Sequence, residues 1–130
     1  MPHHLRLWWS LGFALLALIT ALSLLPIRGP DLDLPNSDKL NHALAYSVLM
    51  LYFGQLVGGG WRRRLAVAAG LLAYGIVIEL LQSRLPPRTA ELADLAANLG
   101  GMAIGALLLR TRLGRLMVAV ERRLTSRTRL

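Results

Sequence analysis

Four apolar stretches, separated by short polar or glycine- and proline-containing breaks, make up most of the chain. They cover residues 7–25, 40–57, 65–81 and 92–109. Each is about 17–19 residues long, which is enough to cross a hydrocarbon layer of roughly 30 Å at a rise of about 1.5 Å per residue. Each is also apolar around most of its circumference, unlike an amphipathic surface helix, and open strand edges cannot be satisfied in lipid. The pattern therefore predicts an all-α fold, a four-helix transmembrane bundle, in which the first span is a retained helix rather than a cleaved signal peptide.

The residues after the fourth span follow a different pattern. Leu113, Leu116, Val120 and Leu124 recur at three- and four-residue spacing among many arginines. One apolar stripe against a basic background is typical of a helix lying on a membrane surface. We therefore divide the chain into a membrane domain, residues 1–110, and a basic amphipathic tail, residues 111–130, that forms a C-terminal cytoplasmic or interfacial helix.

The distribution of charge predicts how the spans are oriented. The chain is 55% hydrophobic and 17% charged, and its net charge is +8. Of its 15 basic residues, 11 lie before the first span, between the second and third, or after the fourth, which an even number of crossings places on one side. The positive-inside rule predicts a multi-pass protein of a bacterial cytoplasmic (inner) membrane with both termini in the cytoplasm. The expected partners of these charges are membrane lipids with anionic headgroups, and no nucleic acid.

Ionisable and amide residues gather at the opposite, outer end of the predicted bundle. Counted from the cytoplasmic boundary of its own span, each of His42, Glu79 and Asp94 lies about 22–24 Å up. A buried carboxylate or imidazole is costly in lipid, so these groups are expected to turn inward and to share one site. The full set of outer-end polar residues is Asp38, Lys39, His42, Tyr46, Glu79, Gln82, Arg88, Asp94 and Asn98.

The residue types suggest two kinds of role. His42, Glu79 and Asp94 are candidate catalytic residues, because an imidazole with two carboxylates can perform acid–base chemistry. Asp38, Lys39, Tyr46, Gln82, Arg88 and Asn98 are candidate ligand-binding residues, and the Lys39 and Arg88 side chains suit a phosphate or a carboxylate. We predict no metal site and no cofactor, since the chain has no HExxH-type spacing and no cysteine, which also excludes disulfides and thiol catalysis. Gly101 and Gly105 are predicted to be packing residues.

These motifs, in this order, resemble one known family. The series is Asp38-Lys39-x-x-His42-x-x-x-Tyr46, then Glu79-x-x-Gln82, Arg88, and Asp94-x-x-x-Asn98-x-x-Gly101. It is similar to the pattern of the VanZ-like family of bacterial integral membrane proteins and spans about half the chain, so residues 1–110 are expected to form a VanZ-like membrane domain. The resemblance implies a role in the physiology of the cell envelope. Glycopeptide resistance, which belongs to particular members, is not assigned to this chain.

Three functions are compatible with the sequence. The first is a binding protein with an outer-leaflet pocket for an anionic lipid headgroup or an envelope precursor. The second is an intramembrane hydrolase or transferase that uses His42 with Glu79 or Asp94, although the chain has no obvious nucleophile. The third is a structural module in which the polar cluster only locks helix packing.

Overall fold

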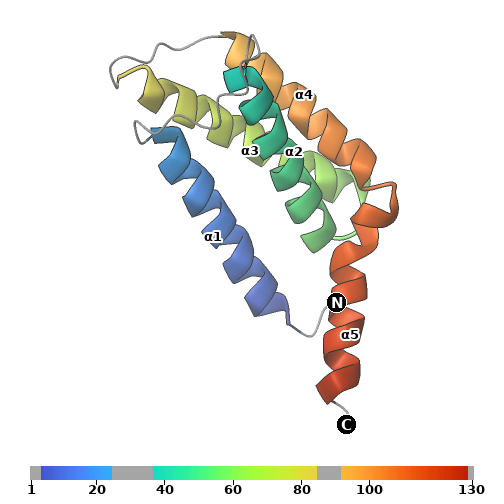
Figure 1. The fold of residues 1–130 in the computed structure, drawn as a ribbon. Helices are drawn as coiled ribbons and strands as arrows, with labels where there is room; N and C mark the ends of the chain where they lie inside the picture. The colour runs from blue at the N-terminus through green and yellow to red at the C-terminus, as the bar shows by residue number, and fades with distance from the viewer. Residues whose placement is uncertain (1–3, 25–36, 85–91, 129–130) are drawn as a thin grey trace.

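A computed structural model describes residues 4–24, 37–84 and 92–128 of the chain. The regular elements in these ranges are all helical, which confirms the all-α prediction. They are α1 (Leu5–Leu24), α2 (Ser37–Leu56), α3 (Trp61–Gln82), α4 (Leu92–Leu108), a 3₁₀ turn η1 (Arg112–Arg115) and α5 (Leu116–Thr128) (Figure 1). The first four cover the predicted apolar spans to within a few residues at each end.

The number of helices that could cross a membrane alone is smaller than predicted. By length and composition α1 and α3 qualify, and a third crossing is obtained only if α4 is counted together with η1 and α5, from which it is bent by 74°. The α4 helix has 17 residues, or about 26 Å at the usual rise. The α2 helix has 20 residues but carries Lys39, Asn41 and His42 in its first turns and Gln55 in its last. These polar residues lower its overall hydropathy.

The α2 helix is the centre of the molecule, and α4 is its most extensive partner (Figure 1). The close approach depends on two glycines of α4. A Cβ atom on Gly101 would overlap the backbone of Ala43, and one on Gly105 would lie 2.5 Å from the Ser47 carbonyl oxygen. Backbones this close are typical of small-residue helix contacts. The structure therefore supports the packing role predicted for both glycines.

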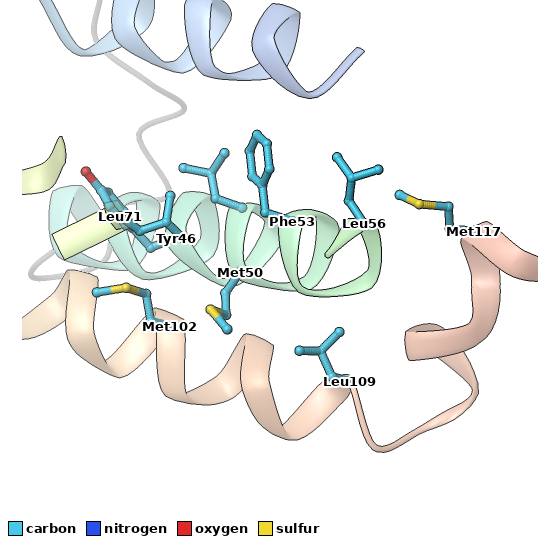
Figure 2. Packing of buried hydrophobic residues seen from close by; sticks show 9 residues of the cluster. Tyr46, Met50, Phe53, Leu56, Leu71, Met102, Leu109 and Met117 are labelled. Atoms are coloured by element: carbon cyan, nitrogen blue, oxygen red, sulfur yellow. The ribbon is translucent and has the colours of Figure 1, made fainter. Parts of the chain in front are cut away.

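The apolar core follows α2 along most of its length. Figure 2 shows Phe53 on the side of α2 that faces α1 and Met50 on the side that faces α4, where it lies among Met102 and Leu109. Leu71 of α3 and Met117 of α5 complete the cluster. All the long elements thus contribute to one core, but α1 contributes only partly buried residues such as Trp9 and Leu16.

The α1 helix is attached to the bundle by hydrogen bonds at both ends. Near its start, the Tyr52 hydroxyl donates to the Trp8 carbonyl oxygen at 2.6 Å. Towards its end, the hydroxyls of Thr20 and Tyr74 are 2.6 Å apart, and the Gln82 amide donates to the Ser23 carbonyl oxygen at 2.8 Å. The start of α1 therefore lies beside the end of α2, and its end lies beside the second half of α3, as expected for helices that alternate in direction.

Candidate functional site

The first pair of predicted site residues at the outer end joins α2 to α4. Lys39, in the first turn of α2, places its ammonium nitrogen 3.6 Å from Oδ1 of Asp94, in the first turn of α4. The carboxylate is buried, whereas about a quarter (26%) of the lysine side chain is exposed. A separation of 3.6 Å is an ion pair but exceeds the length of a charge-assisted hydrogen bond. Oδ1 of Asp94 has no hydrogen-bond partner in the part of the chain that the structure describes.

One helical turn further along, His42 contacts Asn98. The ring Nδ1 of His42 lies 3.2 Å from Oδ1 of Asn98, whose residue is only 2% exposed. An amide oxygen can only accept, so in this arrangement Nδ1 carries the proton and donates it. In a neutral ring Nε2 is then the basic nitrogen. The Lys39–Asp94 pair and the His42–Asn98 pair lie about one helical turn apart, as expected because their members are three and four residues apart on α2 and α4.

A third set of contacts brings α3 to the same region. A Cβ atom on Gly75 would lie 3.0 Å from the side-chain nitrogen of Asn98 and 3.1 Å from the Tyr46 hydroxyl oxygen, so all three helices meet at this glycine. Glu79, one turn beyond Gly75 on α3, is buried and interacts electrostatically with Tyr46. The Tyr46 ring also packs on Tyr74, with 6.2 Å between the ring centroids.

These contacts form a ladder along the helices. His42 contacts Asn98, Asp94 pairs with Lys39, and Glu79 interacts with Tyr46. Among residues 4–24, 37–84 and 92–128, no group of three His, Asp or Glu side chains could hold a metal ion. Each candidate catalytic residue therefore contacts a different one of the residues that the sequence marked as ligand-binding.

Three predicted site residues remain. Gln82 makes its hydrogen bond to α1, and the side chains of Asp38 and Arg88 lie outside what the structure describes. Gln82 is buried, but its amide bonds to the α1 backbone at Ser23, so it ties α1 to α3. Asp38 is the second residue of α2, but its side chain lies outside what the structure describes, as does the whole of Arg88. Sequence reasoning missed Tyr74 and Gly75, although Gly75 and Glu79 share one face of α3 at a spacing of four residues.

A second polar cluster, at the opposite end of the bundle, was not predicted. The carboxylate of Glu121 in α5 is buried and accepts three hydrogen bonds from the start of α1. Its Oε1 accepts from the His4 backbone N–H at 3.0 Å and lies 2.8 Å from His4 Nδ1, and its Oε2 accepts from the Trp8 indole N–H at 2.7 Å. The hydrogen bond from Trp8, with those from His4, lowers the pKa of Glu121 to about 2. The one sequence signal was that Glu121 is the only acidic residue after Asp94.

No protein-family model, curated protein or solved structure matches this chain.

Proposed function

We propose that this chain is a multi-pass protein of a bacterial cytoplasmic membrane, related to the VanZ-like family, in which α1 to α4 all cross the bilayer and both termini are cytoplasmic. Two features support this location. The helices α1 and α3 are long and apolar enough to cross, and α2 and α4 are tightly paired with each other, so that their polar residues can be shielded from lipid. The excess of arginine at the α5 end of the bundle supports the orientation.

We propose further that the outer-end cluster recognises an anionic lipid headgroup or a lipid-linked envelope precursor. The observation that carries this proposal is the Lys39–Asp94 pair. The buried Asp94 carboxylate holds the partly exposed side chain of Lys39 at the outer end of the bundle, and Oδ1 of Asp94 accepts no hydrogen bond from the described residues. A headgroup phosphate suits this arrangement, because it can pair with the ammonium of Lys39, which the Asp94 carboxylate holds in place.

The test measures how tightly the purified protein, placed in nanodiscs that contain phosphatidylglycerol, retains this lipid at the proposed site. Lys39→Gln and Asp94→Asn are expected to weaken retention roughly tenfold, which corresponds to the loss of one charge-assisted contact of about 1.5 kcal/mol. Ser126→Ala, at an exposed position at the other end of the bundle, is the control and is expected to retain lipid as the wild type does.

Folded yield, measured in parallel, separates binding from packing. Normal yield with reduced lipid retention supports the proposed site. Loss of yield in both variants would instead support the structural module, in which the polar ladder only locks α2 to α4. Normal yield and normal retention would reject both functions.

A second candidate function, proton transfer in an intramembrane hydrolase or transferase, is favoured by one observation. Because Asn98 fixes the Nδ1 proton of His42, Nε2 is left as the basic nitrogen of a neutral ring. In this function His42→Gln abolishes turnover of a lipid-linked substrate while lipid retention persists. A turnover that survives His42→Gln would exclude it.

A further inference from the structure

The η1–α5 segment presents positive charge to its surroundings and hides its one negative charge. Five arginines of the segment are exposed: Arg112, Arg115, Arg122, Arg123 and Arg127. Glu121 is the only acidic residue between positions 111 and 128, and it is turned into the molecule, where His4 and Trp8 take up its carboxylate. The exposed ionic surface of this segment is therefore cationic throughout.

The segment is fixed to the bundle rather than loosely attached. Met117 and Glu121, four residues apart on one face of α5, are both buried, and Met117 belongs to the main core cluster. The first turn of α5 is anchored as well, because the Met117 backbone N–H donates to the Gln55 side-chain oxygen of α2 at 2.9 Å. Figure 1 shows that α5, held in this way, extends beyond the ends of α2, α3 and α4 and lies beside the start of α1.

An apolar stripe on α5 remains uncovered. Leu116, Val120 and Leu124 follow one another at four-residue spacing and are all exposed, Leu116 to 54%. At 100° per residue they cover an arc of about 80°, and Arg123 and Arg127 lie on or beside the edge of this arc away from Met117. A nucleic-acid surface would engage the arginines but leave the stripe in water. An anionic bilayer surface takes up both, since the apolar side chains enter the headgroup boundary and the arginines pair with lipid phosphates.

We propose that η1–α5 is a peripheral membrane arm that lies on an anionic lipid leaflet and is held in place by the Glu121 clasp, defined as the three contacts from His4 and Trp8 to Glu121. The occupant of the uncovered face is the bilayer surface on the side of the chain termini. This inference rests on the membrane location proposed above, but it concerns a surface at the opposite end from the outer-end cluster.

The arm can be tested with spin labels, because the chain has no native cysteine. Nitroxides are attached at Val120→Cys in the stripe, at Ser126→Cys away from it, and at Val77→Cys on the exposed face of α3. The full-length protein is placed in phosphatidylcholine nanodiscs with and without phosphatidylglycerol. Frequent collisions of a nitroxide with oxygen show that the label lies in lipid, and frequent collisions with a water-soluble nickel chelate show that it lies in water. We expect lipid at Val120 in the anionic discs, water at Ser126, and lipid at Val77 in both discs.

Charge-removal variants supply the control. Each arginine at an anionic surface contributes about fivefold to partitioning, so replacing Arg123 and Arg127, the two arginines beside the stripe, together by glutamine is expected to weaken docking roughly 25-fold and to return the Val120 label to water. The matched replacement of the same two residues by lysine is expected to leave the label in lipid.

Three results would overturn the inference, and they are distinguishable. Water at Val120 in anionic discs, with lipid at Val77, removes the arm and leaves the membrane location standing. Water at Val77 as well removes the membrane location itself. Immobilisation of the Val120 label by a short DNA duplex but not by phosphatidylglycerol would assign the surface to nucleic acid.

Discussion

At the scale of single residues, the outer end of the bundle depends on pairings between side chains that hydrocarbon would otherwise exclude. Asn98 is almost completely buried, with its oxygen on His42 and its nitrogen facing the space above Gly75. Sequence spacing placed these residues at one depth and on inward faces. It could not specify the partners, because a pairing such as Lys39 with Asp94 depends on how the two helices are rotated about their axes.

Removing the Asn98 amide should destabilise the bundle. Asn98→Ala deletes the partner of His42 Nδ1 and leaves a partly buried polar group unsatisfied, so we expect a loss of about 1–2 kcal/mol in the free energy of unfolding. Leu99→Ala, at an exposed position one residue later, should change it by less than about 0.5 kcal/mol. Unfolding in detergent micelles, followed by circular dichroism, measures both. Equal effects of the two substitutions would show that the Asn98 contact is not formed.

The two adjacent glycines of α4 make a matched pair. Gly101→Ala places a methyl group against the Ala43 backbone, whereas nothing lies within 4 Å of a Cβ atom on Gly100. We expect Gly101→Ala to lower the free energy of unfolding by about 1–3 kcal/mol, because backbone cannot move aside as a flexible side chain can. Gly100→Ala should raise stability by up to about 1 kcal/mol through helix propensity alone. Thermal unfolding of both variants in the same detergent provides the comparison, and the same sign of change at both positions would contradict the α2–α4 contact.

At the scale of helices, the positions of the elements followed from the sequence more readily than their roles. Apolar length located α1 to α4 to within a few residues, and the three- and four-residue spacing of leucines located α5. The attachment of α5 to α1 was not predictable, because His4 and Glu121 are 117 positions apart and nothing local in the sequence marks them as partners. Gln82 was assigned to the site because it lies one turn from Glu79, but a rotation of about 60° between them turns it towards α1 instead.

The Glu121 clasp should weaken in acid. The folded pKa of Glu121, about 2, lies below the ordinary value of 4.5. The stabilisation that the clasp contributes is therefore fully present above about pH 4.5 and is lost as the pH falls from 4.5 to about 2. His4 is the titratable group that faces the carboxylate, and Arg122 and Arg123 flank it on α5. Spin labels at Ser10→Cys and Ser126→Cys should move apart over this pH range, as measured by double electron–electron resonance. In Glu121→Gln, which has no carboxyl group to titrate, the distance should not change over this range.

At the scale of the whole molecule, the two polar clusters lie at opposite ends of one helical bundle, and the chain termini share an end with the arginines. The alternation of helix direction was predictable from the short connections. The lengths of the apolar stretches did not determine the number of crossings. Neither α2 nor α4 qualifies alone as a membrane-spanning helix, yet the two pack closely against each other. Their pairing depends on Gly101, Gly105 and the polar ladder, so it is a tertiary property.

The proposed orientation predicts a labelling pattern in cells. A cysteine at Arg84, exposed where α3 ends, should react with an impermeant maleimide added from outside. Cysteines at Arg63 and Arg122, both exposed at the other end, should react only after the membrane is permeabilised. The positive-inside rule is the physical basis of this expectation. Labelling of Arg63→Cys in intact cells would reverse the proposed orientation.

The short length of α4 has a consequence for the lipid around it. At 17 residues the helix is about 26 Å long, a few ångströms less than a typical hydrocarbon core. Beyond its last turn the chain bends by 74° and cannot extend the crossing in the same direction. In the proposed location, surrounding acyl chains must compress to meet α4, at a cost of a fraction of a kcal/mol per ångström of mismatch. Lipid beside α4 should therefore be thinner than lipid beside α3, which has 22 residues, and headgroups should sit closer to Lys39 and Asp94 there.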